Sequence, residues 1–395
     1  MKKTRLLCLL TALTVCLALT PWAGQAEENE IYDEGDGIYS TVAAGWNWLF
    51  SYVENGARIE GLRYFPGAMD MVIPDTIAGL PVVESCGWLF MQIARNFSSI
   101  RFMDNLTYIP NWVCYRAVNV REVSIPPKVQ HVGCYAFAGC TGIEEVYLPD
   151  TALRLEDGIF EGCENLKKIR MPAGLTRIPE SFLSVCTSLE HVDIPAGVTA
   201  IGGWAFNYCT ALTSLKLPAG VTYIGERAFG YSGLTSLEIP RGVEQIVYQT
   251  FMGCKNLRHV TIPDTVTRID RSAFQDCTAL TRLTIPASVT SIHADAFSGC
   301  DQLVLTVDEG SYAQQYAEEN KIPYVLRGSE PALRGDVNGD GQVDIMDVIR
   351  LLKAVSGWQV EYDRDVADVT GDGTADIMDV IRLLKHVSGW SVTLE

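Results

Sequence analysis

A proline recurs at nearly constant intervals through the middle of this 395-residue chain, and a short apolar-polar-apolar segment precedes each copy. The eight copies are Pro126, Pro149, Pro172, Pro195, Pro218, Pro240, Pro263 and Pro286, so the interval is 23 residues with a single exception of 22. Alternation of this kind predicts a half-buried β-strand, which proline ends because it cannot donate to a ladder. A 23-residue unit cannot bury its own apolar side, so we expect the units to stack into a solenoid.

Further apolar columns follow each proline, and they predict continuous buried ladders. A Phe with a Cys three residues later recurs as Phe137 and Cys140, Phe160 and Cys163, Phe206 and Cys209, Phe251 and Cys254, Phe274 and Cys277, and Phe297 and Cys300. Phe182 stands one residue early before Cys186, and Ser232 replaces the Cys after Phe229. Ten Cys follow residue 26, an even number that would suit disulfides in an exported protein. Seven of them share one column, however, which favours buried free thiols. The state of Cys86, Cys114 and Cys134 is left open.

The repeat unit TSLKLPAGVTYIGERAFGYSGL resembles the BspA-like leucine-rich repeats of bacterial surface and secreted proteins, over residues 70 to 310. The resemblance implies an interaction module or adhesin. We expect residues 27–97 to form a leader and an N-terminal cap, with a capping hairpin at FSYVENGARIEGL. The solenoid is expected at 98–326, closed by a helix and a strand, and a linker follows at 327–333. The polar strand positions predict a mixed-charge face, either one suited to a protein or glycan partner or a solvated face with no single ligand. These positions are Glu122, Glu145, Lys168, His191, Ser214, Ser236, His259 and Arg282.

The C-terminus holds two 12-residue acidic segments, DVNGDGQVDIMD at 336–347 and DVTGDGTADIMD at 368–379. Calcium takes six to eight oxygen ligands, which such a loop supplies from positions 1, 3, 5, 7, 9 and 12. The predicted ligands are Asp336, Asn338, Asp340, the carbonyl of Gln342, Asp344 and Asp347, then Asp368, Thr370, Asp372, the carbonyl of Thr374, Asp376 and Asp379. An Asp/Gly-rich turn without metal is the alternative.

An ordinary EF-hand pair fits this region less well. Position 12 is Asp rather than the bidentate Glu, and no helix fits before the first loop because Pro331 and Gly335 lie just upstream. The same segment, VIRLLK, follows both loops.

This loop–helix duplication at 334–395 resembles a type I dockerin. The expected fold is therefore α+β, a leucine-rich-repeat solenoid followed by a small all-α module with two loop–helix repeats. The resemblance implies two calcium ions and a cohesin domain of a scaffoldin as partner. It places cohesin contacts at Ile345, Met346, Leu352, Lys353, Ile377, Met378, Leu384 and Lys385. Because the two copies match, binding in two orientations is expected. Two readings stay open, an exposed Ile-Met patch or inward packing of Ile345 and Ile377. Thr370 predicts a weaker second calcium site.

The first 26 residues read as a secretory signal peptide, with Lys2, Lys3 and Arg5 before an apolar run that is too short to span a bilayer. We expect a secreted protein without membrane insertion. The net charge is −17, and since three basic and no acidic residues precede residue 27, the rest carries −20. Such acidity argues against nucleic-acid binding.

The sequence thus predicts a noncatalytic, secreted subunit of a cellulosome-type assembly. It contains only five His and none of the common nucleophile or zinc-protease motifs. Two alternatives remain, a carbohydrate-active enzyme whose acids cluster at Glu28, Glu30, Asp33, Glu34 and Asp36, and a free calcium-dependent adhesin.

Overall fold

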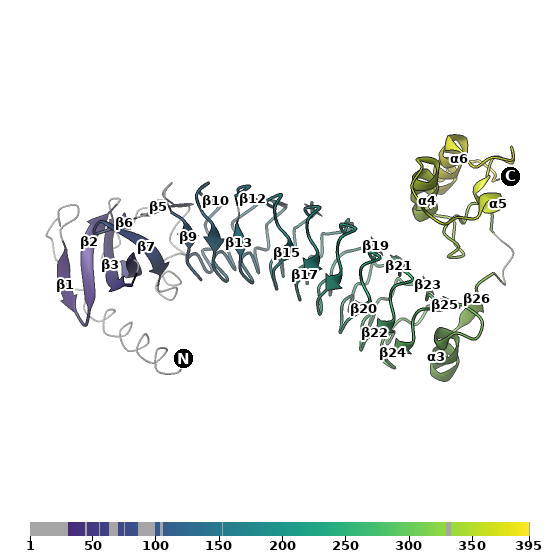
Figure 1. Ribbon diagram of the computed structural model, residues 1–395, viewed down its shortest axis with the longest axis horizontal. Coiled ribbons are helices and arrows are strands. Elements are labelled where there is room, and N and C mark those ends of the chain that lie inside the picture. Colours follow the sequence, from purple (N-terminus) through teal and green to yellow (C-terminus); the bar gives the residue numbers. More distant parts are fainter. Residues whose placement is uncertain are drawn as a thin grey trace. The chain divides into compact units, whose positions relative to one another are not determined.

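The computed structural model describes residues 31–43, 46–54, 56–62, 70–74, 76–85, 99–102, 106–151, 153–328 and 333–394 (Figure 1). The predicted signal peptide, Cys86 and residues 329–332 of the predicted linker lie outside these ranges. The chain divides into two compact units, Met1–Leu234 and Thr235–Glu395. Within the described residues, no helix has the length and hydrophobicity needed to cross a bilayer.

The first unit begins with a six-stranded sheet in the order β1-β2-β3-β4-β7-β6. Its strands are β1 (Tyr32–Gly35), β2 (Ile38–Ala43), β3 (Trp46–Val53), β4 (Gly56–Leu62), β6 (Thr76–Ile77) and β7 (Leu80–Ser85). The antiparallel hairpin β3–β4 turns between Val53 and Gly56, in the segment for which the sequence predicts a capping hairpin. Trp48 and Phe50 are fully buried, so the sheet has its own apolar side.

Short parallel strands then build the turns of the solenoid, as predicted. The longest ladder contains β5 (Asp70–Ile73), β8 (Ser99–Phe102), β10 (Glu122–Ser124), β12 (Glu145–Tyr147), β14 (Lys168–Arg170) and β16 (His191–Val192). Two further ladders contain β9 (Tyr108–Ile109), β11 (His131–Val132) and β13 (Arg154–Leu155), and β15 (Arg177–Ile178), β17 (Ala200–Ile201) and β18 (Tyr223–Ile224). In the three-residue strands β10, β12 and β14 of this ladder the middle residue, such as Val146, is buried between exposed neighbours.

One strand that the period predicts is missing. Residues 214–216 stand at the strand position of their repeat, yet they form no ladder in the structure. The following repeat is the one shortened to 22 residues, and Leu234 follows Ser232 after two residues where Leu212 follows Cys209 after three. We attribute the gap to this deletion, because it shortens the connection that leads into the next strand and interrupts the regular register.

The Phe and Cys columns are buried as predicted, with two exchanges of residues. Leu183 occupies the Phe position of its turn and Phe182 occupies the neighbouring small-residue position, and both are buried. Cys114 fills the Phe position of an earlier turn, since its carbonyl accepts the hydrogen bond from Cys140 that Phe carbonyls accept elsewhere. Neighbouring Phe rings stack within each unit, with centroids 5.1 Å apart for Phe251 and Phe274.

All nine cysteines that the structure describes are free thiols, which confirms the thiol ladder over disulfides. The thiols of the column donate to the carbonyl of the Phe position one turn earlier. These hydrogen bonds join Cys140 to Cys114, Cys163 to Phe137, Cys186 to Phe160, Cys209 to Leu183, Cys277 to Phe251 and Cys300 to Phe274. Burial raises the pKa of Cys140 and of Cys209 to about 12. These two thiols are therefore neutral and act as small apolar residues with one useful donor.

A second column in the first unit adopts the left-handed backbone region, which the sequence reasoning did not anticipate. It contains Trp112, Tyr135, Gly158, Ser181, Trp204 and Arg227, with φ between 52° and 65°. Most of these residues are not glycine, so the conformation costs about 1–2 kcal/mol each. Their backbone amides donate to the next turn, for example Trp204 to Glu226, and the rings of Trp112 and Tyr135 stack 4.4 Å apart. We call these six residues the left-handed column.

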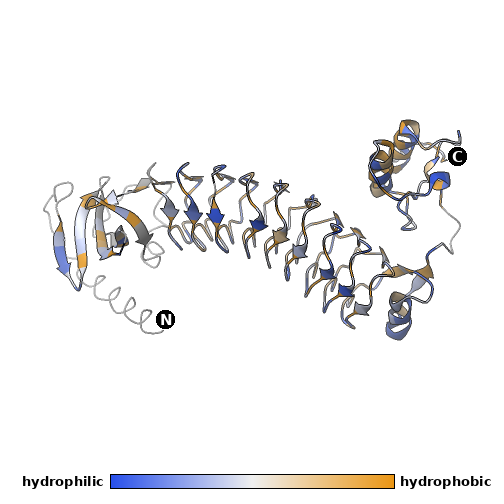
Figure 2. Ribbon diagram, in the orientation of Figure 1, coloured by the Kyte–Doolittle hydropathy of each residue, from blue (hydrophilic) through white to orange (hydrophobic). Residues whose placement is uncertain are grey.

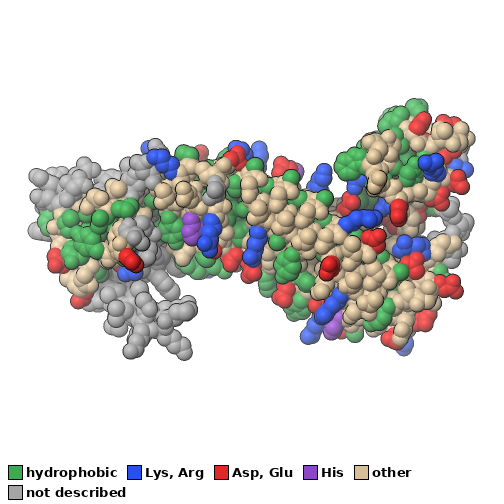
Figure 3. All heavy atoms as spheres, viewed as in Figure 1, with side chains coloured by type: hydrophobic (Ala, Val, Ile, Leu, Met, Phe, Trp, Pro, Cys, Tyr) green, Lys and Arg blue, Asp and Glu red, His purple; other side chains and the backbone are tan. Residues whose placement is uncertain are grey.

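The second unit continues with the same kind of turn. Its ladders are β19 (Ser236–Glu238) with β21 (His259–Thr261), β20 (Gln245–Ile246) with β22 (Arg268–Ile269) and β24 (Ser291–Ile292), and β23 (Arg282–Thr284) with β25 (Val304–Val307) and β26 (Tyr324–Leu326). Helix α3 (Tyr312–Asn320) precedes β26 and begins at Ser311, whose side chain caps it. This helix and strand lie in the segment 311–326, where the sequence predicts them. On the face seen in Figure 3, acidic and basic side chains are interspersed over the repeats.

The same unit ends in a small helical module with α4 (Ile345–Val355), α5 (Arg364–Ala367) and α6 (Ile377–Val387). Its core consists mainly of equivalent residues 32 positions apart, which are Val337 and Val369, Val348 and Val380, and Leu351 and Leu383. Figure 2 shows α4 and α6 as largely hydrophobic. The internal duplication of the sequence is thus also a duplication of the core.

Candidate functional site

The first acidic loop is ordered by its own carboxylates. Asp336 accepts hydrogen bonds from the amides of Asp340 and Gly341, at 3.0 and 2.7 Å. The side chain of Asn338 accepts from Asp340, which in turn accepts from Gln342. Gly341 has φ 84°, so the turn at position 6 uses a conformation that glycine adopts at little cost.

The second loop repeats this frame. Asp368 accepts from the amides of Asp372 and Gly373, at 3.1 and 2.8 Å, and Gly373 has φ 90°. The difference lies at position 3, where the hydroxyl of Thr370 donates to Asp379 at 2.9 Å. Asn338 presents an amide oxygen at the equivalent place, so the first loop has one more strong oxygen donor.

Positions 9 and 12 of each loop also begin the following helix, a role that the sequence reasoning missed. Asp344 is the N-cap of α4 and accepts from Met346, while the fully buried Asp347 accepts from Asp344 and Asn338. Asp376 and Asp379 form the same capping box at α6. Two acidic residues three positions apart directly before an apolar helical stretch are the signal that would have revealed it.

Three acids of the first loop have raised pKa values, because burial and their mutual negative charge oppose ionisation. Burial, reinforced by the negative charges of Asp340 and Asp336, raises the pKa of Asp347 to about 7. Burial also raises the pKa of Asp336 and of Asp340. For Asp344, burial is the largest single effect and opposes ionisation, but the nearby His259 and the amides of Met346 and Asp347 together outweigh it and lower the pKa. A group of partly buried acids of this kind is stabilised by a cation.

The donor set suits a hard cation. Within the described residues, no three His, Cys, Asp or Glu side chains converge as a preformed metal cluster. The carboxylates are instead turned toward the loop amides, as the hydrogen bonds above show. All predicted ligands nevertheless carry oxygen, the donor that calcium takes. The residues therefore fit calcium.

The residues predicted as partner contacts lie mainly on exposed helix faces. Ile345 is 44% exposed and Ile377 is 49% exposed, so the alternative that these two pack inside the module is wrong. Leu352 and Leu384 are also exposed, and Ile349 and Ile381 complete a stripe on each helix. The two copies differ at the methionine, because Met378 is 55% exposed whereas Met346 is half-buried.

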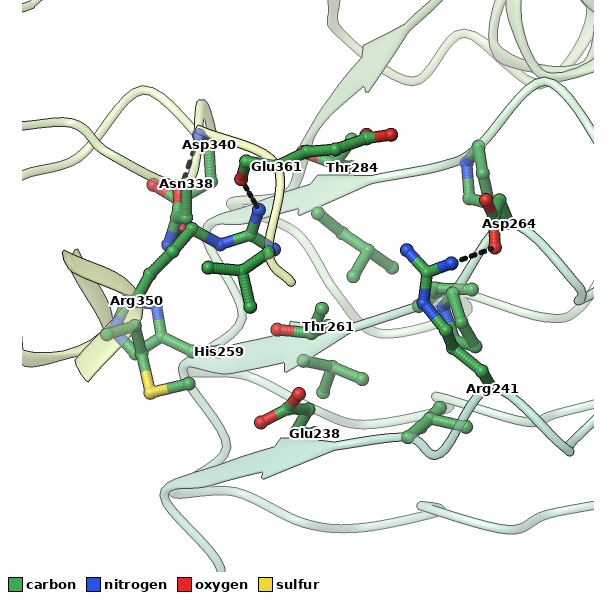
Figure 4. A pocket seen from close by; sticks show the side chains of 18 of the residues that line it. Glu238, Arg241, His259, Thr261, Asp264, Thr284, Asn338, Asp340, Arg350 and Glu361 are labelled. Atoms are coloured by element: carbon green, nitrogen blue, oxygen red, sulfur yellow. Dashed lines mark hydrogen bonds and ion pairs between the residues drawn. The ribbon is translucent and has the colours of Figure 1, made fainter. Parts of the chain in front are cut away.

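This difference arises at a cavity of about 270 Å³ inside the second unit (Figure 4). It lies between the strands β19, β21 and β23 on one side and the first acidic loop with α4 on the other. Two ion pairs join the repeats to the module beside it. The Nε2 atom of His259 lies 2.9 Å from a carboxylate oxygen of Asp344, and the ammonium of Lys353 lies 2.7 Å from Glu238. The sequence reasoning placed His259 on an exposed strand face and did not foresee these partners.

Two family models match the chain. The BspA type Leucine rich repeat region matches residues 89–213 and 178–304, with six copies, and the Dockerin type I domain matches residues 334–388. Both resemblances predicted from the sequence are thereby confirmed, and no catalytic domain is among the matches.

Solved structures of similar fold are leucine-rich repeat proteins. A leucine rich cell surface protein from Faecalibacterium prausnitzii is 23% identical over 77% of this chain and 96% of its own, with a TM-score of 0.45. A leucine-rich repeat protein from Bacteroides ovatus is 18% identical over 74% and 99%, with a TM-score of 0.42. The leucine-rich repeat protein of T. pallidum is 24% identical over 60% and 90%, with a TM-score of 0.35. Among curated proteins, none matches the chain.

Proposed function

Because this chain belongs to the BspA-type leucine-rich repeat family and ends in a type I dockerin module, we propose that it is a secreted, noncatalytic subunit of a cellulosome-type assembly. The module at 334–395 attaches the chain to a cohesin domain of a scaffoldin, and attachment requires calcium. The repeats present a surface for a second partner, which is a protein or a glycan.

The observation that carries this proposal is the duplicated loop–helix unit. Each copy combines an acidic loop, a glycine turn at position 6, a capping box and an exposed apolar stripe on its helix. An apolar stripe that remains exposed in a module with a complete core of its own is typical of a docking surface.

The loop residues hold the helices in place. In the family, a bound calcium ion neutralises the loop acids and fixes the loop. In this chain the loop of Asp336 to Asp347 ends as the first turn of α4, so the geometry of the loop sets where the exposed stripe begins. Asp347 and Asp379 link each loop to its helix. Each carboxylate accepts one hydrogen bond from a backbone amide of the loop and one from the amide of the helix N-cap residue.

The strand face of the repeats supports a role in recognition. Its exposed positions carry both signs of charge, as in Glu145, Lys168 and Arg170, and the tyrosine at 147 is half exposed. A surface of mixed charge with exposed aromatic residues suits a specific partner better than a polyanion.

The test uses the mature full chain and a panel of immobilised cohesins in calcium or in chelator. We expect the wild-type chain to bind in calcium and not in chelator. The double variant Asp336→Ala with Asp368→Ala is expected to bind under neither condition. The matched control is Asp365→Ala, which removes an exposed acid of the module outside both loops and leaves binding unchanged. Failure of the wild-type chain to bind any cohesin in calcium, or binding that persists in chelator, contradicts the proposal.

A further inference from the structure

Helices α4 and α6 share their first nine residues but have different surroundings. The nine residues IMDVIRLLK occupy 345–353 in α4 and 377–385 in α6. On each helix the Met, Arg and Lys of this segment are spaced i, i+4, i+7 and share one flank. We call Met346, Arg350 and Lys353 the first flank, and Met378, Arg382 and Lys385 the second flank.

The first flank and its loop contact three consecutive strands of the solenoid. Lys353 pairs with Glu238 on β19, and Asp344 pairs with His259 on β21. The loop backbone reaches β23, since a Cβ added to Gly341 would lie 2.5 Å from a guanidinium nitrogen of Arg282. Met346 and Arg350 line the cavity between these contacts (Figure 4). The side chain of Lys353 is only 27% exposed as a result.

The second flank differs from the first in the contact of its lysine. Lys385 lies over the ring of Trp390 within the module, whereas Lys353 pairs with Glu238 on β19. The two arginines are alike, since Arg350 donates to the carbonyl of Glu361 as Arg382 does to that of Thr393. Met378 is correspondingly more exposed than Met346. The same chemical surface is therefore seated on the repeats in one copy and open in the other.

The charges on the solenoid strands match the first loop–helix repeat at one place in the series of repeats. There, Glu238 faces Lys353, and in the next repeat His259 faces Asp344. In the repeat after that, Arg282 faces the acidic loop at Gly341. Among the strand positions equivalent to Glu238, the only other acid is Asp193. The two repeats after it carry Ser214 and Ser236 where His259 and Arg282 stand after Glu238.

We propose that the face of β19, β21 and β23 is a docking surface for the first loop–helix repeat of the same chain, and that a cohesin therefore engages the second repeat. The assignment of a cohesin as the outside partner rests on the proposed function. A module with two equivalent surfaces, which by itself permits two orientations, presents one orientation in this chain because its own repeats occupy the other surface.

A crosslinking experiment tests the docking surface without any partner. The full chain carrying Glu238→Cys and Lys353→Cys is treated in calcium with a short bismaleimide crosslinker and compared with Glu238→Cys and Lys385→Cys, because an ion pair between two long side chains leaves their Cα atoms too far apart for a direct disulfide. We expect an intramolecular crosslink in the first variant and at least about tenfold less in the second. Equal yields, or no crosslink in the first variant, overturn the proposal. The thiols of the buried column do not interfere while the chain is folded.

A binding experiment tests the consequence for the partner. Met378→Ala with Lys385→Ala is expected to weaken cohesin binding by about tenfold or more, the effect of losing interface contacts at a hot spot. The matched variant, Met346→Ala with Lys353→Ala, changes it by less than about twofold. Adding Glu238→Lys and His259→Glu to the second-flank variant frees the first repeat and restores binding.

The outcomes separate the two hypotheses. If both flank variants weaken cohesin binding equally, the single orientation is overturned, whereas the hypothesis that the chain binds a cohesin stands. A specific crosslink in a chain that binds no cohesin refutes the proposed function and supports the docking surface.

Discussion

At the scale of single residues, the last acid of each loop carries two functions. Asp347 and Asp379 are fully buried, and each accepts one amide from the loop and one from the helix cap. The carboxylate that we propose as a calcium ligand is therefore already positioned by hydrogen bonds from backbone amides. Removing its charge and removing its acceptors are separate perturbations.

Two substitutions at Asp379 separate these functions. Asp379→Asn keeps an acceptor, whereas Asp379→Ala leaves two buried amides without one, which costs about 1–3 kcal/mol. In chelator, we expect the free energy of unfolding to fall for Asp379→Ala but not for Asp379→Asn. In calcium, both variants should lack the additional stability that the wild type gains from the ion. Thermal unfolding followed by helical circular dichroism, with and without calcium, measures both. Equal stability of the two variants in chelator would show that the cap contributes nothing.

Position and residue type were enough to predict which residues form the acidic loops, because oxygen ligands must recur at fixed positions of a 12-residue turn. They were not enough to predict the exposure of Ile345 and Ile377. An amphipathic pattern identifies the helix face that packs in the core, here Val348 and Leu351, but an apolar residue on the other face has the same hydrophobicity in sequence. Only the packed module distinguishes the two.

At the scale of elements, the buried columns determine the repeat. Period and residue type predicted the Phe and Cys ladders, but not the exchange of Phe182 and Leu183, because two adjacent inward positions can share their total volume in either order. The missing strand at 214–216 was not predicted either. A strand needs partners in register, and although the 22-residue interval is visible in the sequence, residues 214–216 themselves fit the strand pattern.

A stacked ring in the middle of a column should carry a large share of stability. Phe274 is fully buried between Phe251 and Phe297, with centroids 5.1 and 5.5 Å away. Phe274→Ala is expected to cost about 3–5 kcal/mol in the free energy of unfolding. The control Tyr147→Ala removes an exposed ring and costs less than about 1 kcal/mol. Urea unfolding curves of the two variants provide the comparison.

The thiol column predicts a loss of stability at alkaline pH. Burial raises the folded-state pKa of Cys140 and Cys209 to about 12, above the value of 9.0 for an ordinary thiol. Their contribution is complete below pH 9 and is lost as pH rises toward 12, by at most about 1.4 kcal/mol per pH unit for each thiol. The slope of unfolding free energy against pH should therefore be shallower in Cys140→Ala with Cys209→Ala than in the wild type. An unchanged slope would mean that these thiols titrate normally.

At the scale of the whole molecule, the C-terminal unit joins repeats and module by ion pairs at Asp344 and Lys353. The sequence predicted both parts, because each has its own period, 23 residues in one and 32 in the other. It did not predict the contact between them. His259 and Asp344 are far apart in the sequence, and each already has a role in its own repeat, His259 as a polar strand residue and Asp344 as position 9 of the loop.

Calcium removal should therefore be felt beyond the module. We expect the amides of β21 to exchange with solvent faster in chelator than in calcium, because the ordered loop holds Asp344 against His259. In His259→Ala this dependence on calcium should be weaker by about fivefold or more, while the calcium-dependent helicity of the module stays. Hydrogen exchange read peptide by peptide checks both. Identical exchange of β21 with and without calcium in the wild type would contradict the coupling.

The left-handed column of the first unit has a consequence for protein engineering. Its residues hold the turns together through their amides, while Trp112 and Trp204 extend their side chains outward from the core. Each turn thus offers a position whose side chain is free to vary while the backbone contact is kept, about 4.8 Å from the next. A library randomised at Trp112, Tyr135, Ser181, Trp204 and Arg227, with Asn and Gly well represented, would explore a linear array of contacts on an unchanged scaffold.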